Sequence, residues 1–482
     1  MKPPPIRRHD RSRSGRPDQR GITIILVAIS MVGILAMAAL SIDVITLYLA
    51  RLEAQRSADA AALTAARIIS ISGLTGDPTD ASDSWEQICA GETSPASQAA
   101  HAVASQNTVA GSTATTITVN YSAGNAKPRE DCTRIHQAFG VNPMVTVQVT
   151  RTALPTIFAR MWGAPTNGVT ATAMAEAFNP SNSGNVGNTD TDAITPVQPR
   201  CVKPWIVPNR DPGNPAGCAP GACNPFVGSI DGSIQHGGIS PIGVIGETFT
   251  LFADCGGSAG ATPCAVTDNP PKANLPLPGP LPLYNGFPAP PPPNLEYLPG
   301  AVPASSVAVP ACGDVSSYQK AVAGCDQTTA YQCGVTAGGP GSNTLDLSIN
   351  PGGSAGDTAA ATQCLIRQAS LGLASGDADS LTTAFPYKIN AGTSNPVAAA
   401  GVLTTSNSIV SFPIYDGTTL AAGTTPPVTI VGFLQVFINY VNTDGSLNAT
   451  VLNVAGCGNG TGTPRSFVTG SSPVPVRLIT PR

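Results

Sequence analysis

An uninterrupted apolar stretch near the start of the chain constrains the fold more than any other feature of the sequence. Residues Ile22 to Ile42 include no ionisable side chain. As a helix, these twenty-one residues would be roughly 31 Å long, enough to cross the hydrocarbon core of a bilayer. Past Asp43, charged residues and alanines continue the helical pattern up to Ser70. The sequence therefore predicts one continuous helix over 21–70, half in lipid and half in water.

The distributions of charge and cysteine predict the same orientation for this helix. Residues 1–20 contain seven Lys or Arg and two Asp, a net charge of +5, whereas the whole chain of 482 residues carries −4. Because basic segments stay on the cytoplasmic side, we expect a cytoplasmic tail at 1–20 and a transmembrane helix at 21–42 of the inner (cytoplasmic) membrane. The cytoplasmic orientation of the tail already explains why basic residues gather at 1–20, so nucleic acid is not an expected partner.

All twelve cysteines follow the helix, which is typical of a periplasmic or extracellular, oxidising compartment. Plausible local bridges join Cys89 to Cys132, Cys255 to Cys264 and Cys325 to Cys333, although spacing alone leaves the pairing open. The candidate disulfide cysteines are Cys89, Cys132, Cys201, Cys218, Cys223, Cys255, Cys264, Cys312, Cys325, Cys333, Cys364 and Cys457.

A cleaved signal peptide is the alternative interpretation of the apolar stretch. Ala36-Met37-Ala38 matches the small-residue pattern that signal peptidase recognises. Against cleavage, the apolar run is long for a signal peptide, and helical character continues for about thirty residues without a turn residue. We expect the helix to be retained, and cleavage near Ala38 stays an open alternative.

The residues around the end of the apolar stretch resemble a known family in both order and spacing. They are Gly21, Ile42-Asp43-Val44, Leu47 to Arg51, Leu52 to Gln55 and Ser57 to Leu63. The segment is similar to the N-terminal module of TadE/TadG-like Flp pilus-assembly proteins. The resemblance implies a bitopic membrane protein with a large exported part, accessory to Flp (tight adherence) pilus biogenesis and working with other pilus-assembly or envelope proteins. It supplies no catalytic residue.

The predicted membrane anchor is bounded by Ile22, Ile42 and Asp43. Asp43 fits the family's acidic position at the end of the transmembrane helix. Without the family resemblance, Asp43 would simply mark where the helix leaves the membrane on the exported side. The run from Ala58 to Ala66 is nearly all small residues, which lets another element approach closely. That element is either the protein's own sheet or a partner subunit.

Three segments after the helix alternate apolar and polar residues, which favours strands with one wet face. They are 116–121, 144–152 and 168–178. A short helix is expected at 154–162, whereas 72–100 is polar and turn-rich. Residues 43–180 are thus predicted to form a pilin-like membrane-proximal module of helix and antiparallel sheet, followed by a linker at 181–200.

Residues 201–482 are predicted to form a disulfide-bonded, β-rich exported domain with a proline-rich insert at 270–303. Strands are expected at 408–414, 428–440 and 447–454, the last two joined by a four-residue turn at 442–445, with 474–479 closing the edge of that sheet. One helix is expected within 357–370, with Asp357 as its N-cap. The predicted fold class is α+β or mainly β, with one N-terminal transmembrane helix.

No constellation of residues indicates catalysis, a cofactor, a metal or a small-molecule substrate. G-x-S-x-G occurs at 256–260 and 352–356. A hydrolase of this type needs a histidine after its serine, but the last histidine of the chain, His236, precedes both strings. The glycine-rich segment 351–357 lacks the lysine of a phosphate loop. His101, His136 and His236 are far apart and lack zinc-site spacing. The string 346–350 departs from the D-x-S-x-S metal site of von Willebrand type A domains at its last position.

The sequence therefore predicts a bitopic envelope protein of Flp pilus or Tad-type assembly that is not an enzyme. Its role would be structural or accessory, in pilus biogenesis, secretion or adhesion. The alternative is a membrane-anchored surface adhesin or binding protein unrelated to pili. An exported hydrolase is the weaker alternative.

Overall fold

The structure is a computed structural model of the 482-residue chain. It describes residues 20–72, 86–123, 143–156, 158, 163, 166–179, 197–209, 211–213, 225–241, 243–253, 294–299, 312, 316–324, 331–333, 344–345, 355–372, 376–397, 402–415, 428–457, 468–470 and 472–480. The basic tail predicted at 1–20 lies outside the described residues except for Arg20. So do most of the linker at 181–200 and of the insert at 270–303.

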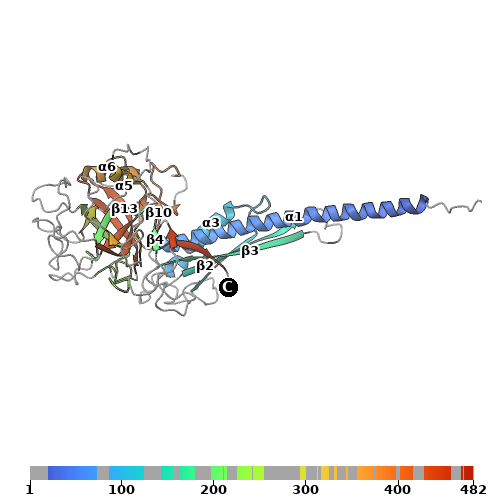
Figure 1. Cartoon of the computed structure of the whole chain (residues 1–482), viewed down its shortest axis with the longest axis horizontal. Helices are drawn as coiled ribbons and strands as arrows, with labels where there is room; N and C mark the ends of the chain where they lie inside the picture. Colours follow the sequence, from blue (N-terminus) through green and yellow to red (C-terminus); the bar gives the residue numbers. More distant parts are fainter. Residues whose placement is uncertain are drawn as a thin grey trace, which may run out of the picture.

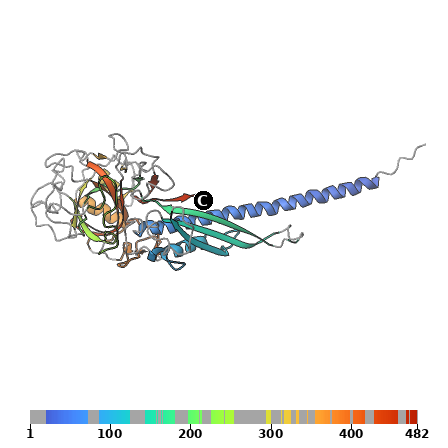
Figure 2. The same ribbon diagram turned by 90° about the horizontal axis from the view of Figure 1, so that it is seen from below.

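The molecule is a rod attached to a globular lobe (Figure 1). The rod is built on helix α1 (Arg20–Ile71), whose 52 residues give a length of about 78 Å. Figure 2 shows that strands cover only the part of α1 nearer the lobe, and that the outer part extends alone. The prediction of one unbroken helix is confirmed, and the overall class is α+β, with mostly antiparallel sheets after the helix.

A four-stranded sheet lies along the inner half of α1, in the order β1-β2-β3-β16. The strands are β1 (Thr116–Ala123), β2 (Pro143–Pro155), β3 (Thr166–Ala177) and β16 (Val476–Ile479). All neighbours are antiparallel, and β1 pairs with β2 without a register shift. The three strands predicted from alternation are confirmed. Their apolar rows lie in one core with the small residues of α1 and α3.

Two expectations about this region are wrong. The segment 72–100 was expected to be turn-rich, but it contains α2 (Glu86–Cys89) and the start of α3 (Pro95–Gln106). The short helix expected at 154–162 does not begin at Leu154, because β2 continues through Pro155, and residues 157 and 159–162 lie outside the described residues. A proline is tolerated at the end of a strand, where its missing N–H breaks no ladder hydrogen bond.

The placement of the last strand is also a correction. Residues 474–479 were expected to close the sheet that contains the 428–454 hairpin. Instead β16 pairs with β3 beside the helix, with Arg477 opposite Glu176. The Arg477 side chain forms an ion pair with buried Glu176 and lies over the ring of Phe178, 4.6 Å from its centroid. A strand near the end of the sequence thus completes the sheet that follows the first helix.

The lobe is organised around a seven-stranded sheet in the order β12-β5-β7-β6-β14-β13-β8, with β12 also paired to β13. Its long strands confirm the predicted hairpin, although five residues rather than four separate them. The strands are β5 (Trp205–Pro208), β6 (Thr248–Ala253), β7 (Asn294–Pro299), β8 (Thr344–Leu345), β12 (Ile409–Tyr415), β13 (Val428–Val441) and β14 (Leu447–Gly456). Strand β7 falls within the segment predicted as a proline-rich insert.

Two helices pack against this sheet through a hydrogen-bonded aromatic cluster. They are α5 (Ser317–Ala323) and α6 (Ala355–Ile366). Trp205 Nε1 donates to Tyr318 Oη at 2.9 Å, and Tyr318 Oη lies 2.9 Å from Thr358 Oγ1. Asp357 is not the N-cap of α6, because the helix begins at Ala355. Its carboxylate instead accepts from Gln319 Nε2 of α5 at 3.0 Å.

The remaining described strands form two smaller sheets. One has the order β11-β10-β9 and the other pairs β15 with β4. The strands are β9 (Ser380–Leu381), β10 (Ile389–Asn390), β11 (Val402–Leu403), β4 (Val197–Pro199) and β15 (Val468–Gly470).

Candidate functional site

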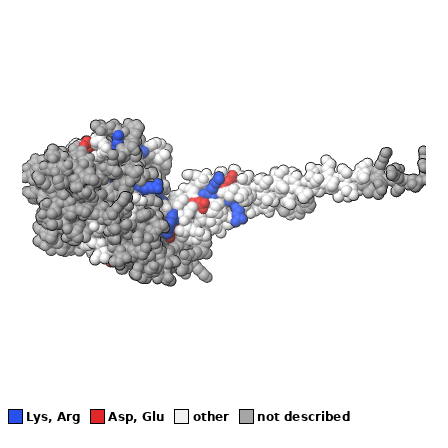
Figure 3. Space-filling view, in the orientation of Figure 1, with Lys and Arg blue, Asp and Glu red and all other residues white. Residues whose placement is uncertain are grey.

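The outer half of α1 is bare and apolar. From Ile24 to Leu35 its large side chains are 60–70% exposed. Figure 3 shows that this end of the rod is white, with charged side chains gathered where α1 meets its sheet. Among the described residues, α1 is the one helix long and apolar enough to span a membrane. Helix α1 also passes through Ala36-Met37-Ala38 without a break.

Asp43 lies where the bare half of α1 ends and contact with the sheet begins. Its side chain is only 3% exposed, and Asp43 Oδ2 accepts from the backbone N–H of Phe158 at 2.9 Å. Phe158 belongs to the connection between β2 and β3, so the carboxylate ties the end of that hairpin to the helix. A charged acceptor makes such a bond stronger than a neutral one.

The small-residue face of α1 packs on the protein's own sheet. Ala54, Ala58 and Ala61 are fully buried in one core with Val147 and Ala173. Helix α3 also packs on α1, where Ser57 Oγ donates to the carbonyl oxygen of Ala104 at 3.4 Å. Of the two interpretations of the run from Ala58 to Ala66, the structure supports the protein's own sheet.

Polar residues of the same motif hold the sheet and loops in position. Gln55 Nε2 donates to the carbonyl oxygen of Thr172 at 3.2 Å and to Asp59 Oδ1 at 2.8 Å. Glu53 Oε2 accepts from the backbone N–H of Ala110 at 2.7 Å. Part of the segment that carries the family resemblance, including Gln55, Ser57 and the buried alanines, therefore forms the interface between α1 and its sheet.

A second face of α1 beyond Asp43 stays apolar and exposed. It turns away from the sheet and continues the surface of the bare half for about three turns. The residues of this exposed stripe are Val44, Ile45, Tyr48, Leu49 and Leu52, which are 40–62% exposed.

A buried polar junction joins α1 to the lobe. Asn453 Nδ2 of β14 donates to the carbonyl oxygen of Ser70 at 2.9 Å, and Ser70 Oγ donates to the carbonyl oxygen of Val474 at 2.7 Å. Asn179 Nδ2, just after β3, donates to the carbonyl oxygen of Val454 at 3.0 Å. Ser70, Asn179 and Asn453 are all fully buried. Buried polar groups left without partners cost free energy, so this network fixes one orientation of the rod on the lobe.

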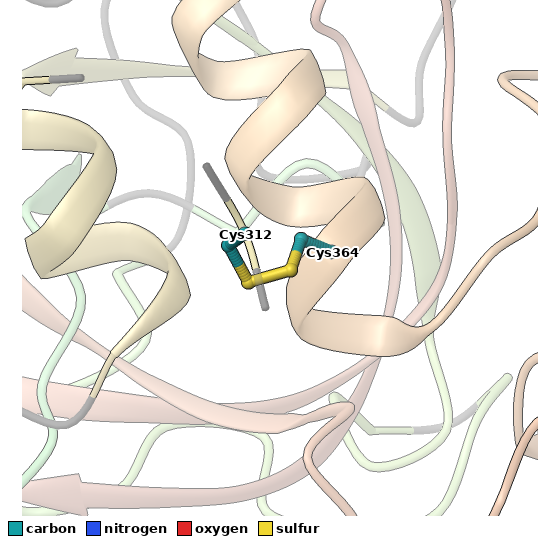
Figure 4. Close-up of a disulfide and its surroundings, with 2 residues drawn as sticks. All are labelled: Cys312 and Cys364. Carbon is teal, nitrogen blue, oxygen red and sulfur yellow. A yellow bond between two sulfur atoms is a disulfide. The ribbon is translucent and has the colours of Figure 1, made fainter. Parts of the chain in front are cut away.

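Every cysteine that the structure describes is in a disulfide. Cys312 pairs with Cys364 of α6, as Figure 4 shows, and Cys333 pairs with Cys457 after β14. The bridge expected between Cys325 and Cys333 is therefore wrong. Cys89 and Cys201 are also disulfide-bonded. The partner expected for Cys89, Cys132, lies outside the described residues, as do both cysteines of the expected 255–264 bridge.

Four charged residues are buried in the lobe, and the sequence did not single them out: Lys203, Asp211, Glu247 and Asp379. Lys203 is 3% exposed, and burial lowers its pKa to about 7. Its Nζ donates to the carbonyl oxygen of Gly324, the C-cap of α5, at 2.6 Å. Burial, and then the neighbouring charge of Asp211, raise the pKa of Glu247 to about 9. Lys203 lies alone between Val202 and Pro204, which is a weak signal in a chain with so few charges, and Asp211 directly follows Arg210 in the sequence.

The residues weighed for catalysis are not brought together. Of the two G-x-S-x-G strings, 256–260 and the serine of 352–356 lie outside the described residues. His101 pairs with Glu92 at the surface, His236 lies in the lobe, and His136 is outside the described residues. Within the described ranges, no group of three or more His, Cys, Asp or Glu is arranged to hold a metal ion.

A family model matches the chain within α1. The family model Tad, which describes TadE/G-like Flp pilus-assembly proteins, matches residues 21–67. The match therefore spans both the bare half of α1 and the half that packs on the sheet. No curated protein and no solved structure matches the chain.

Proposed function

We propose that this chain is a bitopic envelope protein of the Flp pilus or Tad type, with a structural or accessory role in pilus biogenesis, secretion or adhesion. The observation that carries the proposal is the continuity of α1. One helix combines a bare apolar half with a half that docks on the protein's own sheet, and the family match spans both. The proposal assigns no catalytic role.

In this proposal, residues 22–42 span the inner membrane and the basic tail stays in the cytoplasm, with the bulk of the chain periplasmic or extracellular. Retention of the helix is supported by its passage through Ala36-Met37-Ala38, since a peptidase needs extended chain there. The disulfides support an exported lobe, because such bonds persist in oxidising compartments. Intact mass of the membrane-bound protein tests retention, and loss of the first 38 residues would contradict it.

The proposed partners are other pilus-assembly or envelope proteins, and the exposed stripe of α1 offers them a surface. We expect full-length protein, extracted without denaturation, to co-purify with Flp pilus-assembly components. Leu49→Lys, in the stripe, should weaken that association, whereas Arg56→Ala, an exposed change elsewhere on α1, should not. Membrane fractionation checks that both variants are still inserted.

Deletion of the gene separates this proposal from the alternative of a surface adhesin unrelated to pili. Loss of pili supports an assembly role. Normal pili together with lost binding to a surface would reject that role and support the adhesin.

A further inference from the structure

A cavity of about 430 Å³, with polar side chains on both sides, lies between one face of the seven-stranded sheet and the loop that carries β9. Its volume is within the range of small-molecule sites, roughly 300–1,000 Å³. The sheet side is lined by Thr248 of β6, Asn439 of β13, and Asn448 and Thr450 of β14. The loop side includes Thr383 and Tyr387.

The polar lining of the sheet depends on a β-bulge in β13. Ile438 pairs with Ala449 and Tyr440 pairs with Asn448, so Asn439 is an extra residue in the ladder. Asn439 Nδ2 donates to both Asn448 Oδ1 and Thr450 Oγ1 at 2.9 Å. Bulges often re-aim side chains next to functional sites. This bulge places a polar row on a strand that is otherwise rich in Val, Ile and Phe.

The polar row and the facing tyrosine keep unused hydrogen-bonding capacity. Among the described residues, none bonds to Asn439 Oδ1, Asn448 Nδ2 or Tyr387 Oη. Gly246 makes room for that tyrosine, since a Cβ at this position would collide with Tyr387 Oη. The ring of Phe385 lies edge-on to the ring of Tyr387, 5.7 Å away, and holds its orientation.

The charge of the cavity favours a neutral ligand. The described residues that line it include no Lys or Arg. Its one carboxylate, Asp379, is already engaged, because it accepts from the backbone N–H of Gly392 at 3.0 Å, Asn395 Nδ2 at 2.8 Å and Ser406 Oγ at 2.5 Å. An anionic ligand would find no counter-charge, and a cation would find a carboxylate whose oxygens are in use.

We propose that this cavity binds a neutral carbohydrate unit. Amide and hydroxyl side chains both donate and accept, which matches the dense, uncharged hydroxyl groups of a sugar. Asn439, Asn448 and Tyr387 bind those hydroxyl groups, and the tyrosine ring covers part of the apolar face of the sugar. The proposal rests on the cavity alone and does not depend on a role in pilus assembly.

The test uses full-length protein in phosphatidylcholine nanodiscs, because detergents with sugar head groups would compete. An array carrying neutral oligosaccharides, sialylated and sulfated glycans and short peptides supplies the probes. Retention on neutral oligosaccharides is expected. Binding to none of them, or a preference for acidic glycans or peptides, would overturn the proposal.

Variants then locate the binding site. For the best neutral oligosaccharide, Tyr387→Phe and Asn448→Ala should each weaken the affinity about five- to tenfold, the cost of one lost hydrogen bond. Thr383 lines the cavity but is exposed, so the protein should tolerate Thr383→Trp and still fold. The large indole should occupy the cavity and abolish binding. Tyr48→Phe, the same chemical change on α1, is the control. Unchanged affinity in both Tyr387→Phe and Thr383→Trp would reject this site.

Discussion

The side-chain amide of Asn453 donates to the backbone carbonyl oxygen of Ser70 at 2.9 Å, across 383 residues of sequence. Asn453 lies in β14 of the lobe, and Ser70 lies in the last turn of α1. Both are fully buried, so water cannot replace the bond if it is lost. The orientation of the rod on the lobe therefore depends on these buried polar side chains together with an apolar cluster, in which Ile71 of α1 packs with Phe437 and Leu452 of the lobe.

Replacing Asn453 tests this junction. Asn453→Ala leaves the Ser70 carbonyl without its donor and should lower the free energy of unfolding by about 1–3 kcal/mol. The expected signs are a lower Tm and faster proteolysis between α1 and the lobe. Asn448→Ala, on the same strand but away from the junction, is the control. Equal effects of the two variants would show that the junction bond is unimportant.

The fit between α1 and its sheet predicts a strong effect of side-chain size. Ala62 is fully buried against the sheet and α3, whereas Ala60 is only partly buried. Ala62→Leu should overpack this contact and cost about 1–3 kcal/mol, while Ala60→Leu should be nearly neutral. Thermal unfolding of the two variants, side by side, measures the difference. A neutral Ala62→Leu would mean that the helix does not dock as closely as the structure has it.

Buried Lys203 predicts a pH dependence of stability. Its pKa falls from 10.5 to about 7 on folding, so between these values the unfolded chain holds a proton that the folded chain has lost. The free energy of unfolding should therefore rise with pH from about pH 7 to pH 10.5. Lys203→Met should remove this rise and stabilise the protein at pH 6 by on the order of 2 kcal/mol, after allowance for the lost hydrogen bond to Gly324. An unchanged pH profile in the variant would contradict the assignment.

Glu247 predicts a slope of the opposite sign. Its pKa rises from 4.5 to about 9 on folding, so its contribution to stability is complete below pH 4.5 and is lost as the pH rises through 9. Glu247→Gln mimics the protonated form. It should raise Tm at pH 8, where the unfolded chain has lost the proton that the folded chain keeps, and leave Tm nearly unchanged at pH 4, where the acid is protonated in both states. Between pH 7 and 9 the slopes from Lys203 and Glu247 oppose each other, so the two variants must be measured separately.

The bridge between Cys333 and Cys457 should be the stronger of the two described disulfides. It closes a loop of 124 residues, against 52 for Cys312–Cys364. Chain-entropy arguments give a contribution of about 4–5 kcal/mol for the longer loop and slightly less for the shorter one. Replacing both members of each pair by serine and comparing urea unfolding tests this order. Non-reducing peptide mapping checks the pairing, and a peptide that joins Cys325 to Cys333 would contradict it.

The sequence predicted elements well and distant pairings poorly. Strands such as β2 were found because their apolar residues alternate over many positions, and α1 because its apolar run is long. Helix α3 was missed, since PASQAAHAVASQ has few large apolar residues to show a helical period. The Cys333–Cys457 bridge joins residues 124 positions apart and the pairing of β16 with β3 joins residues about 300 apart, which local patterns do not encode.

The candidate sites also differ in whether their residues are close together in the sequence. The anchor and the α1 motif are contiguous in sequence and could be found there. The cavity is assembled from β6, β13, β14 and the loop around Tyr387, and its key feature is a bulge at Asn439. Only the paired register reveals that bulge, so an asparagine in an apolar strand was the single hint available.

The pairing of Arg477 with Glu176 across 301 residues also sets an order of events during synthesis. When β3 has been made, one of its edges has no neighbour, and an unpaired strand edge readily pairs with other chains. That edge can be closed only after the whole lobe has been made and β16 has returned to the rod. A chain whose synthesis stops within the lobe would therefore keep an unpaired edge on β3. Such unfinished chains would be more prone to pair with other chains than complete ones.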